Sequence, residues 1–417
     1  MVEYKDIVVI GSGPSGTMSA IEATKKGAEV ILLENDPIVG DPNHCSGLIT
    51  LQGLSKLKVP YPKSIIENSV DSVNFYSPSN DKLTIRRSKK SEINVFKRNE
   101  LDRSLFRYAN EKVGVEGRFN SRVTGLLVSK GEVQGVKVKP KNGLSYEIKS
   151  KVVIDASGSL ARFVKQAGLI PPDPKWRLPA MQYELDNISD LPTNFVELYH
   201  GINWAPGFFA WIIPTCGGSV RIGLATWKSK NLNIRKLLDH FMLKHPIASQ
   251  TLRKAKIAKV RGGLVTATGP IKKSYSKGYI AVGDTAGQTK ATTGGGVNIG
   301  GFCGRIAGSV AGLHVNNQRE YSLQMYEREW KRLYFKELKG MEYYRKIVGT
   351  LDDRTLDKLF RAIINSSFAN SLKDTKDIDL HTFDLLKAGI NSFRPSMLLT
   401  GLQTSPVIGY RFLQQLF

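Results

Sequence analysis

The start of the chain contains two apolar runs separated by a stretch with helical spacing. The run from Asp6 to Ile10 predicts a buried strand, and the residues from Pro14 to Lys26 predict a helix. A second strand is predicted from Ala28 to Leu33 and ends at Glu34. A strand, a crossover helix and a second strand form a βαβ unit with parallel strands. We therefore expect the chain to begin with an α/β domain.

Farther along, a loop precedes more α/β elements. Residues Pro37 to Gly53 lack periodicity and are rich in Pro, Gly, Asn and Asp, which predicts a long loop after the second strand. Loops of this length in compact domains are commonly functional. The elements predicted next are a helix from Asn99 to Glu111, a hairpin of Val123 to Val128 and Val133 to Val138 around Lys130 and Gly131, and a buried strand from Lys151 to Asp155.

The second half of the chain combines strands with several helices. Aromatic residues and strand-like runs dominate between Pro171 and Trp227, which predicts a second sheet. The later elements predicted are a basic amphipathic helix from Leu232 to Lys244, a buried strand from Tyr279 to Val282, a helix of small residues from Gly296 to Val315, and further helices from about Tyr321 onward.

Glycines recur at every fourth position in the helix of small residues. They are Gly300, Gly304, Gly308 and Gly312, and one helix face formed by them would let another backbone approach closely. Asn298 and Arg305 argue against burial of this helix in lipid. We expect the glycine face to pack beside the nucleotide-binding half of the chain.

Length and composition limit the class of protein. With 417 residues, of which 41% are hydrophobic and 23% charged, the chain has the size of two or three domains and an ordinary globular composition. Disordered and collagen-like chains are excluded. Because Cys45, Cys216 and Cys303 lie far apart, we expect neither a disulfide framework nor a metal site. We also expect no signal peptide and no membrane span, and hence a cytoplasmic protein.

Positive charge exceeds negative charge and is unevenly distributed. The 60 Lys and Arg and 37 Asp and Glu give a formal net charge of +23, which attracts acidic lipid or nucleic acid. Between Lys228 and Lys273 Asp239 is the sole acidic residue, and the helix from Leu232 groups Leu237, Leu238, Phe241 and Met242 on a face typical of a lipid surface. No nucleic-acid module is recognisable, so we expect contact with an anionic membrane surface. A solvated face is the alternative.

A glycine motif joins the first predicted strand to the first predicted helix. It consists of Gly11, Gly13, Pro14, Ser15 and Gly16, with the spacing that lets a backbone approach a pyrophosphate at a helix N-terminus. Glu34 stands where an acidic side chain binds ribose hydroxyls. The motif predicts a dinucleotide site, with a tight structural turn as the alternative.

Two later segments indicate which dinucleotide is bound. Gly283 and Asp284 follow a predicted strand, where the carboxylate can hold hydroxyls of a ribityl chain. The residues Gly294, Gly295, Gly296 and Val297 then open a helix whose positive end can face an anionic flavin ring. NAD has no ribityl chain, so the order of these segments favours FAD. A helix cap and a flexible loop are the structural alternatives.

Together these segments resemble the FAD signature of the para-hydroxybenzoate hydroxylase-type superfamily. The matching segments are Gly11 to Gly16 with Glu34, Arg98-x-x-x-Asp102, Asp155-Ala-Ser-Gly158 with Ser159 and Arg162, and Gly283-Asp284 followed by Gly294 to Gly296. Within this superfamily, residues Asp6 to Ala311 most resemble the geranylgeranyl reductase family, which includes archaeal digeranylgeranylglycerophospholipid reductases. The resemblance implies that Arg98 contacts FAD and that Gly158 belongs to the binding edge.

Two segments carry the resemblance to the reductases. His44-Cys45-Ser46-Gly47 lies in the long loop, where the reductases have a Cys-x-Gly element near the flavin. Phe209-Ala-Trp211-Ile-Ile-Pro214, followed by Gly223-x-Ala225, is similar to their Tyr-x-Trp-x-Phe-Pro…Gly-x-Gly signature. The resemblance implies that Cys45, Ser46 and Gly47 contact the cofactor and that Phe209, Trp211, Pro214 and Gly223 contact the substrate. Phe209, Ile213 and Ala225 depart from the signature, which leaves the individual substrate open.

The implied reaction is the FAD-dependent reduction of isoprenoid double bonds. A prenyl double bond is a poor electrophile, so its reduction needs a flavin hydride and a proton donor at the opposite carbon. Cys45 is the first candidate donor and His44 the second, whereas a small buried core residue is the structural alternative for Cys45. A flavin monooxygenase or halogenase, and a non-catalytic flavoprotein tethered to anionic lipid or nucleic acid, are the alternative functions.

We expect an α/β fold with a Rossmann-like FAD-binding domain, a β-rich substrate (cap) domain and a helical C-terminal region. The FAD-binding domain would comprise residues 1–58, 98–165 and 260–320, the substrate domain residues 59–97 and 166–259, and the C-terminal region residues 321–417. The expected partners are an isoprenoid lipid substrate, an anionic membrane surface, and an electron donor that is a ferredoxin, NAD(P)H or a deazaflavin. The expected location is cytoplasmic with peripheral membrane association.

Overall fold

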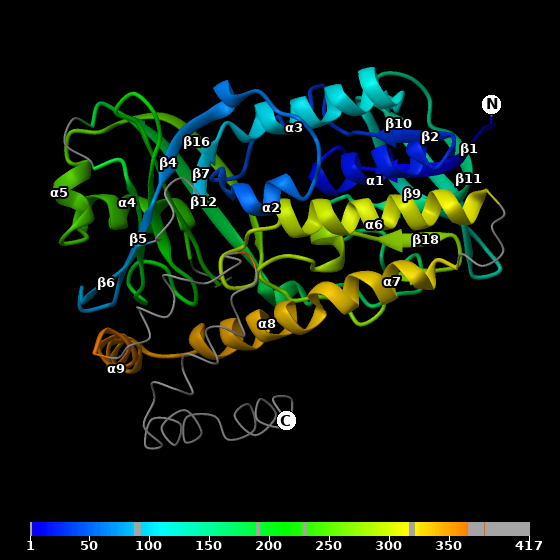
Figure 1. Cartoon of the computed structure of the whole chain (residues 1–417). Coiled ribbons are helices and arrows are strands. Elements are labelled where there is room, and N and C mark those ends of the chain that lie inside the picture. The colour runs from blue at the N-terminus through cyan, green and yellow to red at the C-terminus, as the bar shows by residue number, and fades with distance from the viewer. Residues whose placement is uncertain are drawn as a thin grey trace. The chain divides into compact units, whose positions relative to one another are not determined.

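The computed structural model describes residues 2–86, 93–188, 192–227, 232–316, 322–365 and residue 379 (Figure 1). Its contacts divide the chain into two units. The first contains Met1–Glu67, Asn94–Arg177 and Leu264–Leu338, and the second contains Asn68–Ile93, Leu178–Gly263 and Lys339–Phe417. Each unit is therefore assembled from three separate segments.

The first unit is built on a parallel sheet. Its parallel strands stand in the order β18-β11-β1-β2-β8. They are β1 (Val2–Ile10), β2 (Val30–Leu33), β8 (Glu116–Arg118), β11 (Tyr146–Asp155) and β18 (Tyr279–Ala281), and the antiparallel strands β9 (Ser121–Ser129), β10 (Glu132–Pro140) and β17 (Tyr275–Ser276) extend the sheet. All residues of β2 are buried, which is typical of a strand covered on both faces. The predicted Rossmann-like α/β fold is confirmed.

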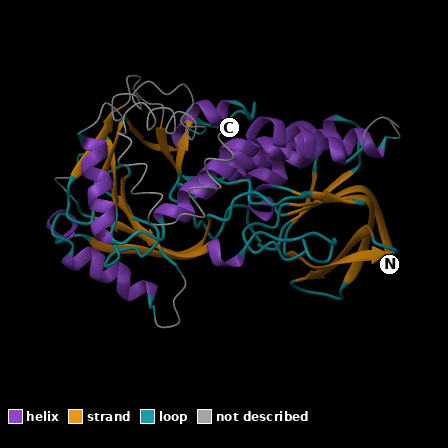
Figure 2. Ribbon diagram, turned by 90° about the horizontal axis from the view of Figure 1, so that it is seen from below, coloured by secondary structure: helices purple, strands orange, loops and turns teal. Residues whose placement is uncertain are grey.

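Two helices of the first unit, α1 (Pro14–Lys25) and α6 (Val297–Val315), lie side by side (Figure 1). A Cβ on Gly304 would collide with the Ser15 carbonyl oxygen, and a Cβ on Gly308 with that of Ser19. The glycine face of α6 therefore allows the two backbones to touch, and the prediction that this face packs in the nucleotide-binding half is confirmed. Figure 2 shows the helices of this unit as a layer beside its strands.

The loop predicted from Pro37 to Gly53 is shorter in the structure. Its second part forms β3 (Leu48–Thr50) and the start of α2 (Leu51–Ser55), whose first turn is capped because Thr50 Oγ1 accepts the Gly53 N–H at 3.3 Å. β3 pairs with β7 (Ile93–Phe96), which also pairs with β4 (Ile66–Val70). The partner of this three-residue strand lies far along the chain, so local periodicity could not indicate it.

The second unit is built on a seven-stranded sheet in the order β16-β12-β15-β14-β13-β5-β6. The strands are β5 (Ser72–Tyr76), β6 (Lys82–Arg86), β12 (Arg177–Asp186), β13 (Phe195–Tyr199), β14 (Ala210–Pro214), β15 (Val220–Ala225) and β16 (Lys256–Thr266). β13 is parallel to β5 and antiparallel to β14. The second sheet predicted between Pro171 and Trp227 is present as β12 to β15, and strands from before and after this region extend it.

Helix α4 (Ile234–Lys244) turns its apolar face to the core of the second unit. Leu238 and Phe241 are fully buried there, and Leu237 and Met242 pack partly buried against the same core. The interpretation of this face as a lipid-binding surface is therefore wrong, because the face contacts the protein's own core. The residues of α4 that are exposed instead are Arg235, Lys236, His240, Leu243 and Lys244.

The C-terminal part is helical as far as the structure describes it. Earlier in the chain, α3 (Arg98–Tyr108) belongs to the first unit and α5 (Ala248–Leu252) to the second. The helices of the C-terminal part are α7 (Gln324–Trp330) in the first unit, α9 (Asp353–Ile364) in the second, and α8 (Lys336–Val348), which begins in the first and continues into the second. The region from residue 321, which was predicted to form a single part, is thus shared between the two units. Lys228, Lys230 and most residues beyond 365 lie outside the described residues. No helix among the described residues is long and apolar enough to cross a membrane.

Candidate cofactor and active site

The glycine loop lies at the carboxyl ends of the adjacent strands β1 and β11. Gly11 has a φ of +95°, and its N–H donates to the Leu33 carbonyl oxygen at 2.8 Å. A Cβ on Gly11 would lie 2.6 Å from the Ala156 carbonyl oxygen, and one on Gly16 would collide with the Gly11 carbonyl oxygen. In open α/β sheets, ligands bind outside the carboxyl ends of the strands, at the point where the connections that leave two neighbouring strands run in opposite directions.

The start of α1 fits the pyrophosphate of a dinucleotide. Among the described residues, none apart from the two chain neighbours of Gly13 has a heavy atom within 4 Å of the position that a Gly13 Cβ would occupy. The first turn of α1, which is described in full, holds no acidic residue, and no side chain caps it. Its N–H groups and the helix dipole are therefore suited to an anion, with Pro14 and Ser15 at the helix start.

Glu34 follows β2 and is bonded to the glycine loop. Its Oε2 accepts the Ser12 N–H at 2.8 Å and the Ser12 hydroxyl at 2.6 Å, and its Oε1 accepts the Asp36 N–H at 3.1 Å. The residue is partly exposed, and a carboxylate oxygen accepts more than one hydrogen bond. Glu34 can therefore hold the loop and still accept ribose hydroxyls.

A second loop follows β18 and carries Asp284. Gly283 has a φ of +66°, and its N–H donates to Gln288 Oε1 at 2.8 Å. Asp284 Oδ2 accepts the Thr266 hydroxyl at 2.9 Å, and a Cβ on Gly296 would lie 2.8 Å from Asp284 Oδ1. The glycine at position 296 thus lets Asp284 lie against the start of α6. Sequence reasoning missed Thr266 and Gln288, because they belong to segments without a motif.

The predicted binding edge around Gly158 lies beside this second loop. Gly158 has a φ of +88°, and its N–H donates to Thr285 Oγ1 at 3.0 Å. The Asp155 carboxylate is fully buried and accepts the Tyr279 hydroxyl at 2.6 Å. This buried bond joins the last residue of β11 to the first residue of β18, whereas Arg162 is exposed.

Arg98 begins α3 and forms a bidentate ion pair with Asp102 one turn later. The two N–O distances are 3.0 Å from Nε and 2.8 Å from Nη2. Burial opposes the guanidinium charge, but Asp102 and Cys45 raise the pKa of Arg98 above its ordinary value. Burial also raises the pKa of Asp284, and Thr266 and the Arg98 charge oppose that shift. Arg98 and Asp102 are thus paired directly, and Cys45 and Asp284 are linked to the Arg98 charge electrostatically.

The loop with Cys45 is held by its own backbone and by β7. Cys45 Sγ accepts the Gly47 N–H at 3.4 Å, and the Gly47 carbonyl oxygen accepts the Phe96 N–H at 2.8 Å. Cys45 and Ser46 are partly exposed. His44 is exposed, and its charge acts on Asp36, whose pKa is raised mainly by burial. Cys45, but not His44, is linked electrostatically to Arg98.

The predicted substrate residues lie in the second unit. Phe209 stacks on Phe208 at a centroid distance of 4.1 Å and meets Trp211 edge-on at 6.2 Å. A Cβ on Gly223 would collide with the Trp211 ring, so this glycine makes room for the indole. The Pro214 carbonyl oxygen accepts the Asn68 amide at 3.0 Å. Sequence reasoning missed Arg345, whose guanidinium lies 4.3 Å from the centre of the Phe208 ring.

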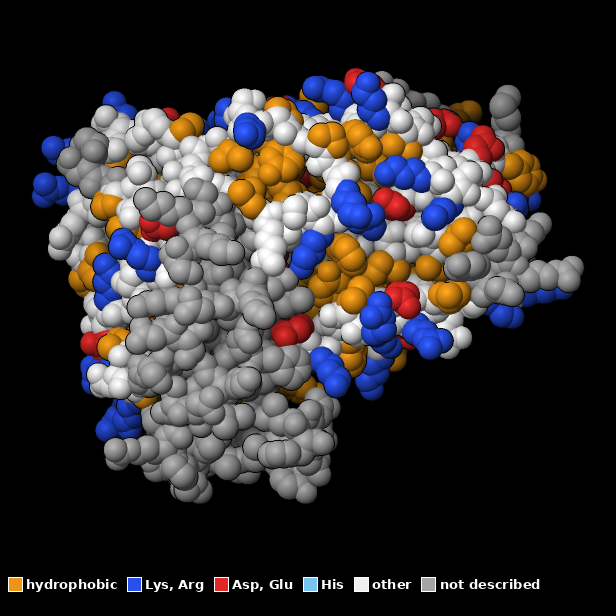
Figure 3. Space-filling model, in the orientation of Figure 1, with side chains coloured by type: hydrophobic (Ala, Val, Ile, Leu, Met, Phe, Trp, Pro, Cys, Tyr) orange, Lys and Arg blue, Asp and Glu red, His pale blue; other side chains and the backbone are white. Residues whose placement is uncertain are grey.

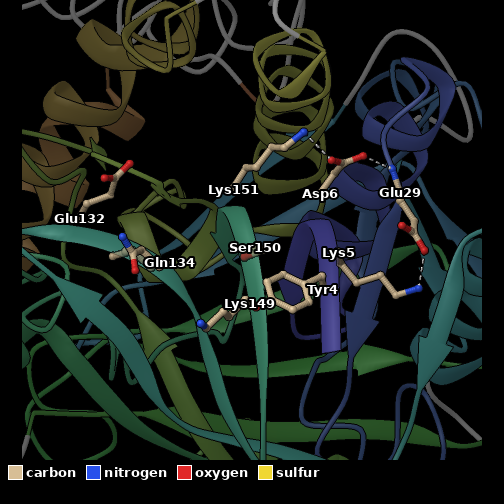
Figure 4. A pocket seen from close by; sticks show the side chains of 10 residues that line it. Tyr4, Lys5, Asp6, Glu29, Glu132, Gln134, Lys149, Ser150 and Lys151 are labelled. Atoms are coloured by element: carbon tan, nitrogen blue, oxygen red, sulfur yellow. Dashed lines mark hydrogen bonds and ion pairs between the residues drawn. The ribbon is translucent and has the colours of Figure 1, made fainter. Parts of the chain in front are cut away.

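A shallow depression of about 440 Å³ lies at the other end of the first sheet (Figure 4). Four of its charged side chains form two ion pairs: Lys151 Nζ lies 2.9 Å from Asp6 Oδ1, and Lys5 Nζ lies 2.7 Å from Glu29 Oε1. The lining residues of β1 and β11 precede the carboxyl ends of these strands, where Gly11 and Asp155 lie. The depression is therefore not part of the dinucleotide site.

Comparison with known proteins identifies the family. Residues 6–170 match the family described as FAD dependent oxidoreductase. A digeranylgeranylglycerophospholipid reductase of Methanocaldococcus jannaschii is 33% identical over 88% of this chain and 93% of its own length. The chain belongs to the geranylgeranyl reductase family. A reductase of the same name from Methanococcus aeolicus is 30% identical over 95% of this chain and 96% of its own.

A solved structure supports the fold of this family member. The crystal structure of a geranylgeranyl bacteriochlorophyll reductase-like protein from Thermoplasma acidophilum superposes with a TM-score of 0.83 and 24% identity, covering 98% of this chain and 100% of that one. The protein is an FAD-dependent oxidoreductase and its cofactor is FAD, as the sequence predicted. Which residues bind FAD stays a prediction, which the glycine loop and the start of α1 support.

Replacing Glu34 with alanine is expected to weaken FAD binding about tenfold or more, because hydrogen bonds to a charged group contribute about 1.5–3 kcal/mol. Fluorescence titration of the apoprotein would measure this. Since Glu34 also accepts the Ser12 hydroxyl, Ser12→Ala is the matched control: it removes that bond and retains the carboxylate. Unchanged FAD affinity in Glu34→Ala would show that Glu34 does not bind the ribose.

Proposed function

We propose that this enzyme saturates the double bonds of geranylgeranyl chains in archaeal-type membrane phospholipids. The observation that carries the proposal is the 33% identity, over 93% of that protein's length, to a protein named digeranylgeranylglycerophospholipid reductase. The partly exposed Cys45, whose loop is held in the first unit by the bond from Phe96 to Gly47, supports it, because the reaction needs a proton donor.

The residues proposed to hold FAD all belong to the first unit. The backbone of the glycine loop and the start of α1 would bind the phosphates, Glu34 the adenosine ribose, and Asp284 the ribityl hydroxyls. The start of α6 lacks a side-chain cap and, in its fully described first turn, an acidic residue, which suits an anionic ring. The full proposed set is Gly11, Gly13, Pro14, Ser15, Gly16, Glu34, Cys45, Ser46, Gly47, Arg98, Gly158, Gly283, Asp284, Gly294, Gly295, Gly296 and Val297.

In the proposed chemistry, one of the two hydrogens added to each double bond comes from the cofactor and the other from the protein. Bound FAD, once reduced, supplies a hydride. Cys45 donates the proton to the other alkene carbon: its S–H bond breaks while the new C–H bond forms, and a solvent proton later restores the thiol. His44 is the second candidate, and its exposure suits proton exchange with solvent.

Aromatic side chains of the second unit are proposed to contact the isoprenoid chain. Phe209 and Trp211 lie in one aromatic cluster, and both are less than 10% exposed. Gly223 leaves room for the Trp211 indole, and Pro214 ends the strand that carries Trp211. Apolar surface of this kind suits a hydrocarbon chain, because recognition of an isoprenoid needs few polar groups.

The decisive experiment gives chemically reduced enzyme a digeranylgeranylglycerophospholipid and follows the lipid by mass spectrometry. The expected product gains two hydrogens for each bond reduced, and chemical reduction removes the need to know whether a ferredoxin, NAD(P)H or a deazaflavin is the donor. Lipid of unchanged mass, with oxygen consumption coupled to another product, would reject the proposal in favour of a monooxygenase or halogenase. FAD that binds but is never reoxidised by substrate would indicate a non-catalytic flavoprotein.

Exposed basic residues of the second unit are proposed to bind an anionic membrane surface. Arg253, Lys254 and Lys256 are exposed, and Ile257 and Val260 beside them are 44% and 47% exposed. On the face drawn in Figure 3, Lys and Arg side chains are more widespread than Asp and Glu. Basic and apolar side chains together suit the surface of an acidic bilayer.

Binding to vesicles with acidic lipids is expected to fall as salt rises, because exposed charges are screened over about 10 Å at 0.1 M. Changing Arg253, Lys254 and Lys256 to Glu should weaken vesicle sedimentation roughly tenfold or more, since each basic residue near an anionic surface contributes about 1 kcal/mol. The control changes the exposed Lys137 and Lys139 of β10 and the exposed Lys141 after it to Glu, which alters the net charge equally. An equal loss of vesicle binding in both variants would show that binding depends on the net charge alone and not on this surface.

A further inference from the structure

We propose that Gln288 and Tyr326 are positioning residues of the FAD site: they fix Gly283 and thereby orient Asp284 toward the ribityl chain. The inference rests on the proposed function, because Asp284 is the residue proposed to bind the ribityl hydroxyls. It goes beyond that function by stating that helix α7, a part of the chain without a recognisable motif, contributes to cofactor binding through Tyr326.

Gln288 closes the loop that carries Asp284. Its Oε1 accepts the Gly283 N–H at 2.8 Å, and its own backbone N–H donates to the Gly283 carbonyl oxygen at 2.9 Å. The φ of Gly283 is +66°, which glycine adopts without strain. Both polar backbone groups of the residue before Asp284 are therefore bonded to Gln288, and the peptide that leads into Asp284 has a fixed orientation.

The Tyr326 hydroxyl fixes the carboxamide of Gln288 from the other side. It accepts a hydrogen bond from Gln288 Nε2 at 2.8 Å and donates to the Ala281 carbonyl oxygen at 2.9 Å. The Gly283 N–H can only donate and the Ala281 carbonyl oxygen can only accept, so the amide oxygen of Gln288 faces Gly283 and its amide nitrogen faces Tyr326. Both side chains are fully buried, where the loss of one bond leaves a polar group without a partner.

Helix α7 is attached to the end of β18 by further bonds, and both elements can be followed in Figure 1. Glu327 Oε2 accepts the Ser274 N–H at 2.6 Å, and Trp330 Nε1 donates to the Ser274 hydroxyl at 2.9 Å. The Ser274 carbonyl oxygen in turn accepts the N–H of Ala281, the last residue of β18, at 2.8 Å. The position of Tyr326 is therefore set by contacts that do not involve the loop with Asp284.

These bonds leave Asp284 itself accessible to a ligand. The residue is partly exposed, and its Oδ2 accepts the Thr266 hydroxyl at 2.9 Å. A carboxylate oxygen accepts more than one hydrogen bond, so both oxygens can still bind hydroxyl groups. A side chain that is oriented in advance loses little conformational freedom on binding, which increases affinity without any new contact. Gln288 and Tyr326 supply this advance orientation for Asp284.

The test compares the binding of FAD and of ADP to FAD-free enzyme by titration calorimetry. ADP has the adenosine and both phosphates of FAD but no ribityl chain. Gln288→Met and Tyr326→Phe are each expected to weaken FAD binding roughly tenfold, because each leaves a buried polar group without its partner, and to change ADP affinity less than about twofold. The double variant should bind FAD only slightly more weakly than either single variant, since coupled residues are not additive.

Ser274→Ala is the matched control. Like Tyr326→Phe it removes one fully buried hydroxyl group that binds α7, but it leaves the bonds of Gln288 intact. It should lower the free energy of unfolding, as Tyr326→Phe does, and leave both affinities near wild type. An equal loss of FAD and ADP affinity in the Gln288 and Tyr326 variants, or an equal loss of FAD affinity in Ser274→Ala, would overturn the proposal in favour of a general loosening of the unit.

Two further results separate this proposal from the proposed function. Wild-type FAD affinity in Asp284→Ala would show that Asp284 does not bind the ribityl chain and would also overturn the positioning role. The titrations need no lipid, so a failure of the proposed reaction would appear separately, as absence of alkene reduction by wild-type enzyme.

Discussion

Gly308→Ala is expected to lower the free energy of unfolding by about 3 kcal/mol, since overpacking a tight contact costs about 1–3 kcal/mol and occasionally more. In an ordinary helix the same change stabilises by about 1 kcal/mol, so the sign itself is diagnostic. A Cβ at position 308 would collide with the Ser19 carbonyl oxygen, which belongs to the backbone of α1 and cannot rotate away. Gly308→Val should prevent folding of the first unit.

The matched control lies on the same helix. A Cβ on Gly301 would lie 3.0 Å from Leu57 Cδ2, a flexible side-chain end that can move. Urea unfolding at saturating FAD should therefore show Gly301→Ala near wild type and Gly308→Ala clearly weaker. Equal stability of the two variants would mean that α1 and α6 separate easily, and that the four-residue glycine repeat serves no packing purpose.

Elements whose causes are local could be predicted from the sequence. The turn at Lys130 and Gly131 is one example: both residues have positive φ, 48° and 75°, as a tight turn between twisted strands requires. The glycine loop is another, because its spacing dictates how closely a backbone can approach. The conformations of this turn and of the glycine loop depend only on residues within one turn or one βαβ unit.

Elements whose causes are distant could not be predicted. β3 depends on pairing with β7, which lies far along the chain. The apolar face of α4 is typical both of a helix on a membrane surface and of a helix packed on a sheet. Only its contacts with the core of the second unit distinguish these two interpretations. The candidate site behaves in the same way. The spacing of Arg98 and Asp102 was visible along one helix, but the position of the Cys45 loop against α3 depends on contacts of Gly40 and Arg103 that carry no motif.

Cys45→Ala is expected to bind FAD fully and to slow single-turnover alkene reduction by roughly 10²-fold or more, because a positioned general acid contributes about 10²–10⁴-fold. The cysteine is partly exposed, and it lies in the unit that carries the glycine loop. Its removal leaves no large cavity, so stability should change little. Stopped-flow reoxidation of chemically reduced enzyme by the lipid, at measured FAD occupancy, gives the rate.

Cys45→Ser separates acidity from size. A hydroxyl occupies nearly the same space and can donate a hydrogen bond, but it is far less acidic than a thiol, so a proton-donor role predicts a rate close to that of Cys45→Ala. A packing role predicts the opposite: Cys45→Ser near wild type in rate, with any loss appearing as lower stability. If both variants retain near wild-type single-turnover rates at full FAD occupancy, Cys45 is not the donor, and His44, exposed and beside Asp36, becomes the next residue to replace.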